Sequence, residues 1–199
     1  FRQNIYERVT LITTLVLFFE LEINKIDNDN LSEMLRLPEV GYYKSWVDAV
    51  RVLKPYQLSD DLEKIIHEKS VVGCTAWVRL FDETLAGIQF VVNYKKLSSS
   101  EVLTRMSDKN PSIRRDAAKA FGKGLKENIR LFSLITNTLA KDKEIDDRWR
   151  GLPHPVSSRN LQNQVEDEVV SALRDAVRKS YPTLSHRYYK LKAQWLGLD

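Results

Sequence analysis

The sequence predicts an all-α fold with one small β-hairpin. Apolar residues recur at three- and four-residue intervals along most of the chain, which is the spacing of one face of an α-helix. Only residues 87–97 combine a β-branched and aromatic run with an Asn-containing turn, which indicates a two-stranded hairpin near residues 88–97. Because a lone hairpin is marginally stable, we expect these strands to pack on helices.

The composition is that of an ordinary globular protein. The chain has 199 residues, of which 43% are hydrophobic and 29% are charged. Its single cysteine, Cys74, argues against a disulfide framework, and no leader or membrane-length apolar run is visible, so we expect a cytoplasmic location. The net charge of +4 is too small to indicate nucleic acid or a membrane surface as partner. The chain begins at Phe1 within a helical pattern, and we interpret it as a piece of a longer polypeptide.

The N-terminal segment, residues 1–59, is expected to be helical. A long amphipathic helix is predicted over residues 2–27, followed by a turn and by shorter helices over residues 31–37 and 40–53, the last stopped by Pro55. The long helix rests on seven regularly spaced apolar residues: Ile5, Val9, Ile12, Val16, Phe19, Ile23 and Ile26.

Residues 60–199 are predicted to form a second helical domain, which can continue from the first as one lobe. Asn110 and Pro111 give the clearest helix start, an N-cap followed by proline at the first helical position. The Pro-flanked segment 151–160 is predicted to be a loop. A first helix is expected to follow Ser59 and to end at Gly73, and the others are expected over residues 75–86, 99–106, 111–140, 161–180 and 184–196.

The dipeptide His67-Glu68 is the first candidate for catalytic chemistry. On a helix, His-Glu-x-x-His places two imidazoles on one face, where they bind zinc, and the Glu takes a proton from the bound water. Here the residue four positions after His67 is Val71, and the other histidines, His154 and His186, lie in different contexts. We therefore expect His67 to contact protein or water, and we expect no metal ligand in this chain.

Nucleophilic catalysis is not indicated either. Cys74 has no histidine at a spacing that implies pairing, and the sequence has no Gly-x-Ser-x-Gly elbow and no phosphate-binding glycine loop. We expect Cys74 to be a buried, inert thiol and the chain to hold no catalytic residue.

The long helix predicted after Pro111 carries a basic stripe within an arc of about 80°. Such a face can bind phosphates or an acidic peptide, but Asp116 and Glu127 flank it, and we favour a solvated outer face. No aromatic residue interleaves with the stripe, as stacking on nucleic acid would require. The basic stripe consists of Arg115, Lys119, Lys123, Lys126 and Arg130.

The segment 147–160 is the candidate for substrate contacts. It concentrates hydrogen-bond donors around rigid prolines, and function is concentrated in loops. An equally supported interpretation is a connecting loop in which Trp149 is the apolar anchor. The candidate channel-facing residues are Arg148, Arg150, His154, Arg159 and Asn160.

Three stretches of the sequence are distinctive when taken together: TAWVRLFDETLAGIQF (75–90), NPSIRRDAAKAFGKGLKENIRLFSLITNTLAKDKEIDDRWRG (110–151) and LSHRYYKLKAQWLGLD (184–199). They resemble the oligoendopeptidase F family, a group of zinc metallopeptidases related to thimet oligopeptidase and neurolysin. Residues 1–59 match that family only in helical character. The resemblance implies an elongated, mostly helical lobe that walls a long internal channel.

The resemblance also implies what the chain does not contain. The zinc site of the family is His-Glu-x-x-His with a later Glu, and it lies C-terminal to the region that is similar here. No catalytic or metal residue can therefore be assigned to this sequence, and zinc is implied for the longer enzyme and not for this fragment. The implied partners are short peptides and the catalytic domain of the same polypeptide. An isolated lobe is also expected to form a homodimer through its exposed apolar face.

The alternative is a non-enzymatic helical interaction module. Residues 108–125 look like the second helix of a HEAT repeat, in which proline starts the helix. HEAT units recur at roughly 40–47 residues in several copies, and no second copy is visible at that period. A His-Glu-x-x-His downstream of Asp199 would support the peptidase, and a second HEAT-like unit would support the module.

Overall fold

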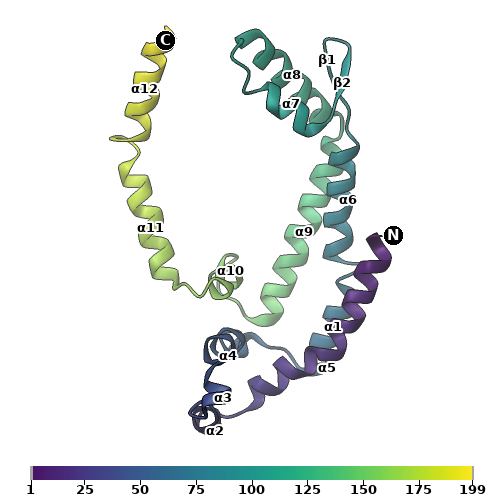
Figure 1. Cartoon of the computed structure of the whole chain (residues 1–199), viewed down its shortest axis with the longest axis vertical. Coiled ribbons are helices and arrows are strands. Elements are labelled where there is room, and N and C mark those ends of the chain that lie inside the picture. The colour runs from purple at the N-terminus through teal and green to yellow at the C-terminus, as the bar shows by residue number, and fades with distance from the viewer. Residues whose placement is uncertain (1, 199) are drawn as a thin grey trace. The chain divides into compact units, whose positions relative to one another are not determined.

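The computed structural model describes residues 2–198, and the regular secondary structure in that range is helical apart from one two-stranded antiparallel sheet (Figure 1). The predicted fold class, mainly α with one small hairpin, is confirmed. In chain order the elements are α1 (Arg2–Lys25), α2 (Asn28–Met34), α3 (Pro38–Gly41), α4 (Lys44–Arg51), the 3-10 turn η1 (Lys54–Tyr56), α5 (Asp60–Lys69), α6 (Cys74–Gly87), β1 (Phe90–Val92), β2 (Lys95–Leu97), α7 (Ser99–Arg105), α8 (Pro111–Glu127), α9 (Ile129–Arg150), α10 (Ser157–Gln162), α11 (Asp167–Ser180) and α12 (Ser185–Leu196).

The contacts divide the chain into two compact units. The first contains the residues up to Phe19 together with Leu58–Trp149, and the second contains Glu20–Gln57 together with Arg150–Asp199. The sequence-based division at residue 59 stays a prediction.

The first unit is organised around the hairpin. Strand β1 pairs with β2 so that Phe90 lies opposite Leu97 and Val92 lies opposite Lys95. The two turn residues have positive φ, 49° at Asn93 and 64° at Tyr94, as a two-residue turn of the I′ kind requires. The hairpin is thus closed by the Asn-containing turn that the sequence indicated.

One face of the hairpin forms the core of this unit. Phe90, Val92 and Leu97 are buried together with Val102 of α7 and Ala117 of α8. This packing confirms the expectation that the strands lie against helices. Helix α7 starts with a capping box, in which Ser98 and Glu101 exchange side-chain and backbone hydrogen bonds, and so follows directly from β2.

The long helix predicted over residues 111–140 is two helices. Asn110 caps α8 as expected, and its side-chain oxygen accepts a hydrogen bond from the backbone N–H of Ser112 at 3.0 Å. Helix α8 ends at Glu127, because Asn128 leaves the helical conformation (φ −106°, ψ 8°) and its side-chain Nδ2 donates to the carbonyl oxygen of Gly124 at 3.0 Å. Helix α9 then continues to Arg150, ten residues further than predicted.

The second unit has its own small core. Ile23 of α1, Leu31 of α2 and Val47 of α4 are buried together, with Ile26, Leu35 and Val50 against them. These residues lie on three elements that a short stretch of chain connects, so this core is local in sequence.

Helix α2 begins earlier than predicted. Residues 28–30 open it, because a carboxylate oxygen of Asp27 accepts hydrogen bonds from the backbone N–H groups of Asp29 at 3.1 Å and of Asn30 at 2.9 Å. These hydrogen bonds lower the pKa of Asp27 below its usual 3.8, and the bond from the backbone N–H of Asn30 contributes most. The helix predicted over residues 40–53 is likewise two, α3 and α4, since α3 starts at Pro38 and the chain leaves regular helix at Tyr42 and Tyr43.

Arg51 of α4 joins the end of α1 to α2. Its Nη1 donates to the carbonyl oxygens of Ile23 at 2.7 Å and Ile26 at 2.9 Å, and its Nη2 donates to Asn28 Oδ1 at 2.6 Å. The cation therefore satisfies carbonyl groups that the helix end leaves without intrahelical partners.

Substituting Arg51→Ala is expected to lower the free energy of unfolding by about 2 kcal/mol, because hydrogen bonds from a charged donor to partly buried carbonyls are lost. Urea denaturation followed by circular dichroism measures the change. Arg36→Ala, at an exposed position of the same unit, is the matched control and should change stability by less than about 0.5 kcal/mol. An equal effect of the two substitutions would contradict this role of Arg51.

Within residues 2–198, the helices lack the combination of length and apolar character that crossing a bilayer requires.

Candidate functional site

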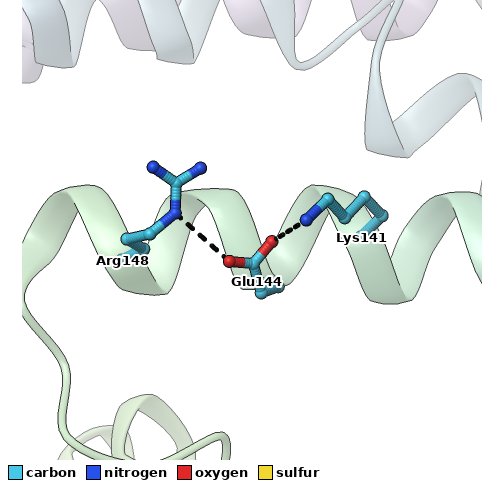
Figure 2. Close-up of polar contacts among 3 residues, drawn as sticks. All are labelled: Lys141, Glu144 and Arg148. Atoms are coloured by element: carbon cyan, nitrogen blue, oxygen red, sulfur yellow. Dashed lines mark hydrogen bonds and ion pairs between the residues drawn. The ribbon is translucent and has the colours of Figure 1, made fainter.

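Arg148 lies near the end of α9 and takes part in an exposed ion-pair network on that helix. Figure 2 shows Glu144 between Lys141 and Arg148, with Arg148 Nε at 3.2 Å from Glu144 Oε1 and the Lys141 ammonium group on the other carboxylate oxygen. Two hydrogen bonds lower the pKa of Glu144 below its usual 4.5. The bond from Lys141 has the larger effect, and the bond from Arg148 adds to it. Exposed pairs of this kind add little stability, so the network mainly orients the guanidinium along its own helix.

Arg150 is the last residue of α9 and begins the second of the two stretches of chain that make up the second unit. Its Nη1 donates to the carbonyl oxygen of Tyr56 in η1 at 3.4 Å in a partly buried contact. Arg150 therefore connects two segments of the second unit that are far apart in the sequence, which gives it a structural task there.

The loop predicted over residues 151–160 is shorter in the structure. It ends at Val156, because Ser157 opens α10 and its Oγ accepts a hydrogen bond from the backbone N–H of His154 at 3.2 Å. The side chain of Asn160, on α10, is buried, and its Nδ2 donates to Asp167 Oδ1 at 2.7 Å. The helix predicted from residue 161 accordingly starts only at Asp167.

The five candidates therefore differ in what they offer a ligand. His154 and Arg159 have exposed side chains, whereas Asn160 is bonded to Asp167 and Arg150 to Tyr56. Their role as channel contacts stays a prediction. The interpretation of Trp149 as an apolar anchor is wrong, since 56% of this residue is exposed.

His67 lies on α5 and faces α1. Its Nε2 is 2.8 Å from the hydroxyl Oγ1 of Thr13, in a partly buried contact within the first unit. The expectation that His67 contacts protein is confirmed. The other histidines, His154 and His186, are exposed on other segments, and residues 2–198 contain no cluster of three or more His, Cys, Asp or Glu side chains that could hold a metal. The residues present therefore do not fit the donor set of a zinc site.

The prediction of a buried Cys74 is wrong, because this residue is exposed. It is the first residue of α6, directly after Gly73. The buried residue at the junction between α5 and α6 is Val71, three positions before Cys74.

All five residues of the basic stripe are exposed on α8 and the start of α9. Lys123 Nζ lies 4.0 Å from Glu127 Oε1, which places a carboxylate within the stripe. This arrangement agrees with the solvated outer face that we favoured from the sequence.

Two polar partners were missed by the sequence analysis. The pairing of Glu144 with Arg148 could have been found, because a glutamate four residues before an arginine is a helix-stabilising pair. The contact between Asn160 and Asp167 crosses the junction between two helices, and no sequence pattern marks it.

A family model, a curated relative and a solved structure all point to the same family. A family model described as Oligopeptidase F matches residues 22–90. Group B oligopeptidase PepB from Streptococcus agalactiae serotype III (strain NEM316) is 23% identical over 189 residues, which are 92% of this chain and 31% of the relative. The crystal structure of oligoendopeptidase-F from Enterococcus faecium superposes with a TM-score of 0.79 at 18% identity, over 96% of this chain and 38% of that one.

The chain thus spans less than two fifths of the length of each of these two relatives. The family-model match includes residues 22–59, so that part of the N-terminal segment resembles the family in more than helical character, contrary to our expectation. The likeness to the solved structure shows a shared fold. The resemblance to the oligopeptidase F family is therefore confirmed, and it lies in the N-terminal region of that family.

Proposed function

We propose that this chain is the helical, channel-wall part of a zinc-dependent oligoendopeptidase that hydrolyses short peptides in the cytoplasm. The observation that carries the proposal is the likeness in fold to an oligoendopeptidase-F over 96% of the chain, at a TM-score of 0.79. The relative PepB is itself named an oligopeptidase, and the single cysteine is consistent with a reducing compartment. These comparisons favour a peptidase over the HEAT-like interaction module.

In this proposal the metal and the catalytic groups are supplied by polypeptide outside residues 1–199. His67 is bonded to Thr13, and the described residues do not fit a zinc site. The task of this chain is then steric: its helices restrict access to the site to short, unfolded peptides. Among the candidate contacts, Arg148, His154 and Arg159 have exposed side chains that can donate hydrogen bonds to a peptide.

The isolated 199-residue chain is expected to bind no stoichiometric zinc and to leave a quenched fluorescent octapeptide intact, because neither the metal ligands nor the catalytic base is in it. Equilibrium dialysis followed by metal analysis measures the zinc, and fluorescence measures cleavage. Stoichiometric zinc together with cleavage would show that the active site lies within these residues.

The coding sequence after Asp199 tests directly whether the longer protein is a peptidase. A His-Glu-x-x-His is expected within the next ~150–250 residues, roughly one domain length. A second HEAT-like unit in its place would contradict the peptidase and support the interaction module.

A further inference from the structure

The net positive charge of the chain is concentrated in one segment near its C-terminal end. Residues 1–175 contain 26 Lys or Arg residues and 26 Asp or Glu residues, so this part has no net charge. Between Asp175 and Asp199 the sequence has no acidic residue, so the whole net charge of +4 belongs to the end of α11 and to α12. The five basic residues of this segment are Arg178, Lys179, Arg187, Lys190 and Lys192.

The structure leaves these five charges without carboxylate partners. All five side chains are exposed, and none of them forms an ion pair with another residue of the described range 2–198. Other helices of the chain pair their exposed lysines one turn away, as Lys44 does with Asp48 at 2.5 Å. The basic stripe also contains such a pair, between Lys123 and Glu127. The segment that includes α12 is therefore the part of the chain whose positive field is least offset, and such a field attracts anionic groups.

Two of the cations and an amide form a row along one side of α12. Arg187, Lys190 and Gln194 are separated by three and four positions, the spacing that places residues on one face of a helix. All three are exposed, and their side chains make no hydrogen bond to another described residue. We call these three residues the α12 row. Lys192 lies apart from the row, with its Nζ 5.7 Å from the centre of the Tyr188 ring.

The α12 row matches a short acidic peptide in chemistry and in length. The guanidinium and ammonium groups can pair with carboxylates, and the amide of Gln194 can both donate to and accept from a peptide group. A helix rises about 10 Å over the seven positions from Arg187 to Gln194, which is the length of about three extended residues. Binding to nucleic acid typically uses roughly six to ten phosphate contacts, more than this row supplies.

We propose that the α12 row binds acidic segments of short peptides, so that the longer enzyme favours substrates that contain Asp or Glu. This inference rests on the proposed function, because it names a substrate class for the same channel wall. It adds a peptide contact on α12 to the candidates in the segment 147–160. Opposite charge raises the local concentration of the peptide and its rate of association, and the amide of Gln194 holds the peptide backbone.

Fluorescence anisotropy on the 199-residue chain tests this binding with three octapeptides that carry the same uncharged dye. The first contains four glutamates, and the other two have glutamine or lysine at the same positions. In about 20 mM salt the glutamate peptide should bind at least about fivefold more tightly than the glutamine peptide, and the lysine peptide should bind most weakly. Raising the salt to about 0.5 M should remove the difference, because exposed charges are then screened.

Two double variants separate the α12 row from the overall charge. Arg187→Glu combined with Lys190→Glu should weaken binding of the glutamate peptide about tenfold, because both cations of the row become repulsive. Lys119→Glu combined with Lys126→Glu, at exposed positions of the basic stripe, changes the net charge by the same amount and is the matched control. It should change the affinity by less than about twofold, since only long-range charge differs. Circular dichroism checks that both variants keep the helix content of the parent chain.

Equal or undetectable binding of the three peptides would overturn the inference, as would equal losses in the two double variants. Binding to vesicles of anionic phospholipid that only the α12 variant abolishes, without a preference among the peptides, would overturn it in favour of a membrane surface. The His-Glu-x-x-His expected after Asp199 tests the proposed function separately. A peptidase without the preference for acidic peptides would refute this inference alone, and the preference in a protein without that motif would refute the proposed function.

Discussion

Phe90→Ala is expected to lower the free energy of unfolding of the first unit by about 3–5 kcal/mol. The Phe90 side chain is 1% exposed, and its ring centroid lies 5.2 Å from that of Phe121 on α8. It is buried with Val92, Leu97 and Val102, which belong to both strands and to α7. Removing the ring therefore leaves a cavity at the point where the hairpin and two helices meet, and these elements cannot close it without moving apart from their other contacts.

The neighbouring residue is the control. Val91 points to the other face of β1 and is 57% exposed, so Val91→Ala should change stability by less than about 0.5 kcal/mol. Both variants are compared by urea denaturation followed by circular dichroism. Similar losses at the two positions would mean that the hairpin does not have the single buried face that the structure gives it.

The hairpin and several helix starts could be predicted because their signals are local. An Asn-containing turn between a β-branched and aromatic run and a short polar strand specifies a hairpin, and Asn110 followed by Pro111 specifies a helix start. The break at Asn128 could not be found in this way, because the apolar spacing continues across it from Phe121 to Phe132. A single residue that leaves the helical conformation does not alter a periodic pattern.

The outward direction of α1 could not be predicted either. The spacing of Ile5, Val9 and Ile12 identifies one apolar face, and burial of that face is the ordinary expectation. The structure instead packs the threonine face against α5, where Thr13 meets His67. Which face is covered depends on elements far away in the sequence, and periodicity contains no information about them.

The candidate site was predictable only as a list of donors. The sequence brought five polar residues together in one segment, but it could not show that Asn160 is buried against Asp167 or that Arg150 binds the carbonyl of Tyr56. These are tertiary contacts. The function came from the resemblance to the oligopeptidase F family, since no motif within the chain specifies a reaction.

Two glycines of α8 are expected to respond in opposite directions to alanine. A Cβ at Gly124 would lie 2.7 Å from Cε1 and 2.8 Å from Cδ1 of Phe90, and 3.1 Å from Cγ2 of Ile88. The ring of Phe90 is held by the core and cannot yield, so Gly124→Ala should lower the free energy of unfolding by about 1–3 kcal/mol. At Gly122 a Cβ would meet nothing within 4 Å, and Gly122→Ala should raise stability by about 0.5–1 kcal/mol.

A double-mutant cycle separates the steric cause from any other requirement for glycine. If the Phe90 ring is what excludes a Cβ, the cost of Gly124→Ala should largely disappear in the Phe90→Ala background, where the added methyl group occupies part of the cavity. The coupling energy from urea denaturation of the four proteins is then positive and of the same size as the single Gly124→Ala effect. A cost that persists without the ring would instead assign the requirement to Ile88 or to the backbone of α8. Gly122→Ala, two residues away on the same helix, should be additive with Phe90→Ala, because its new methyl group faces solvent in both proteins.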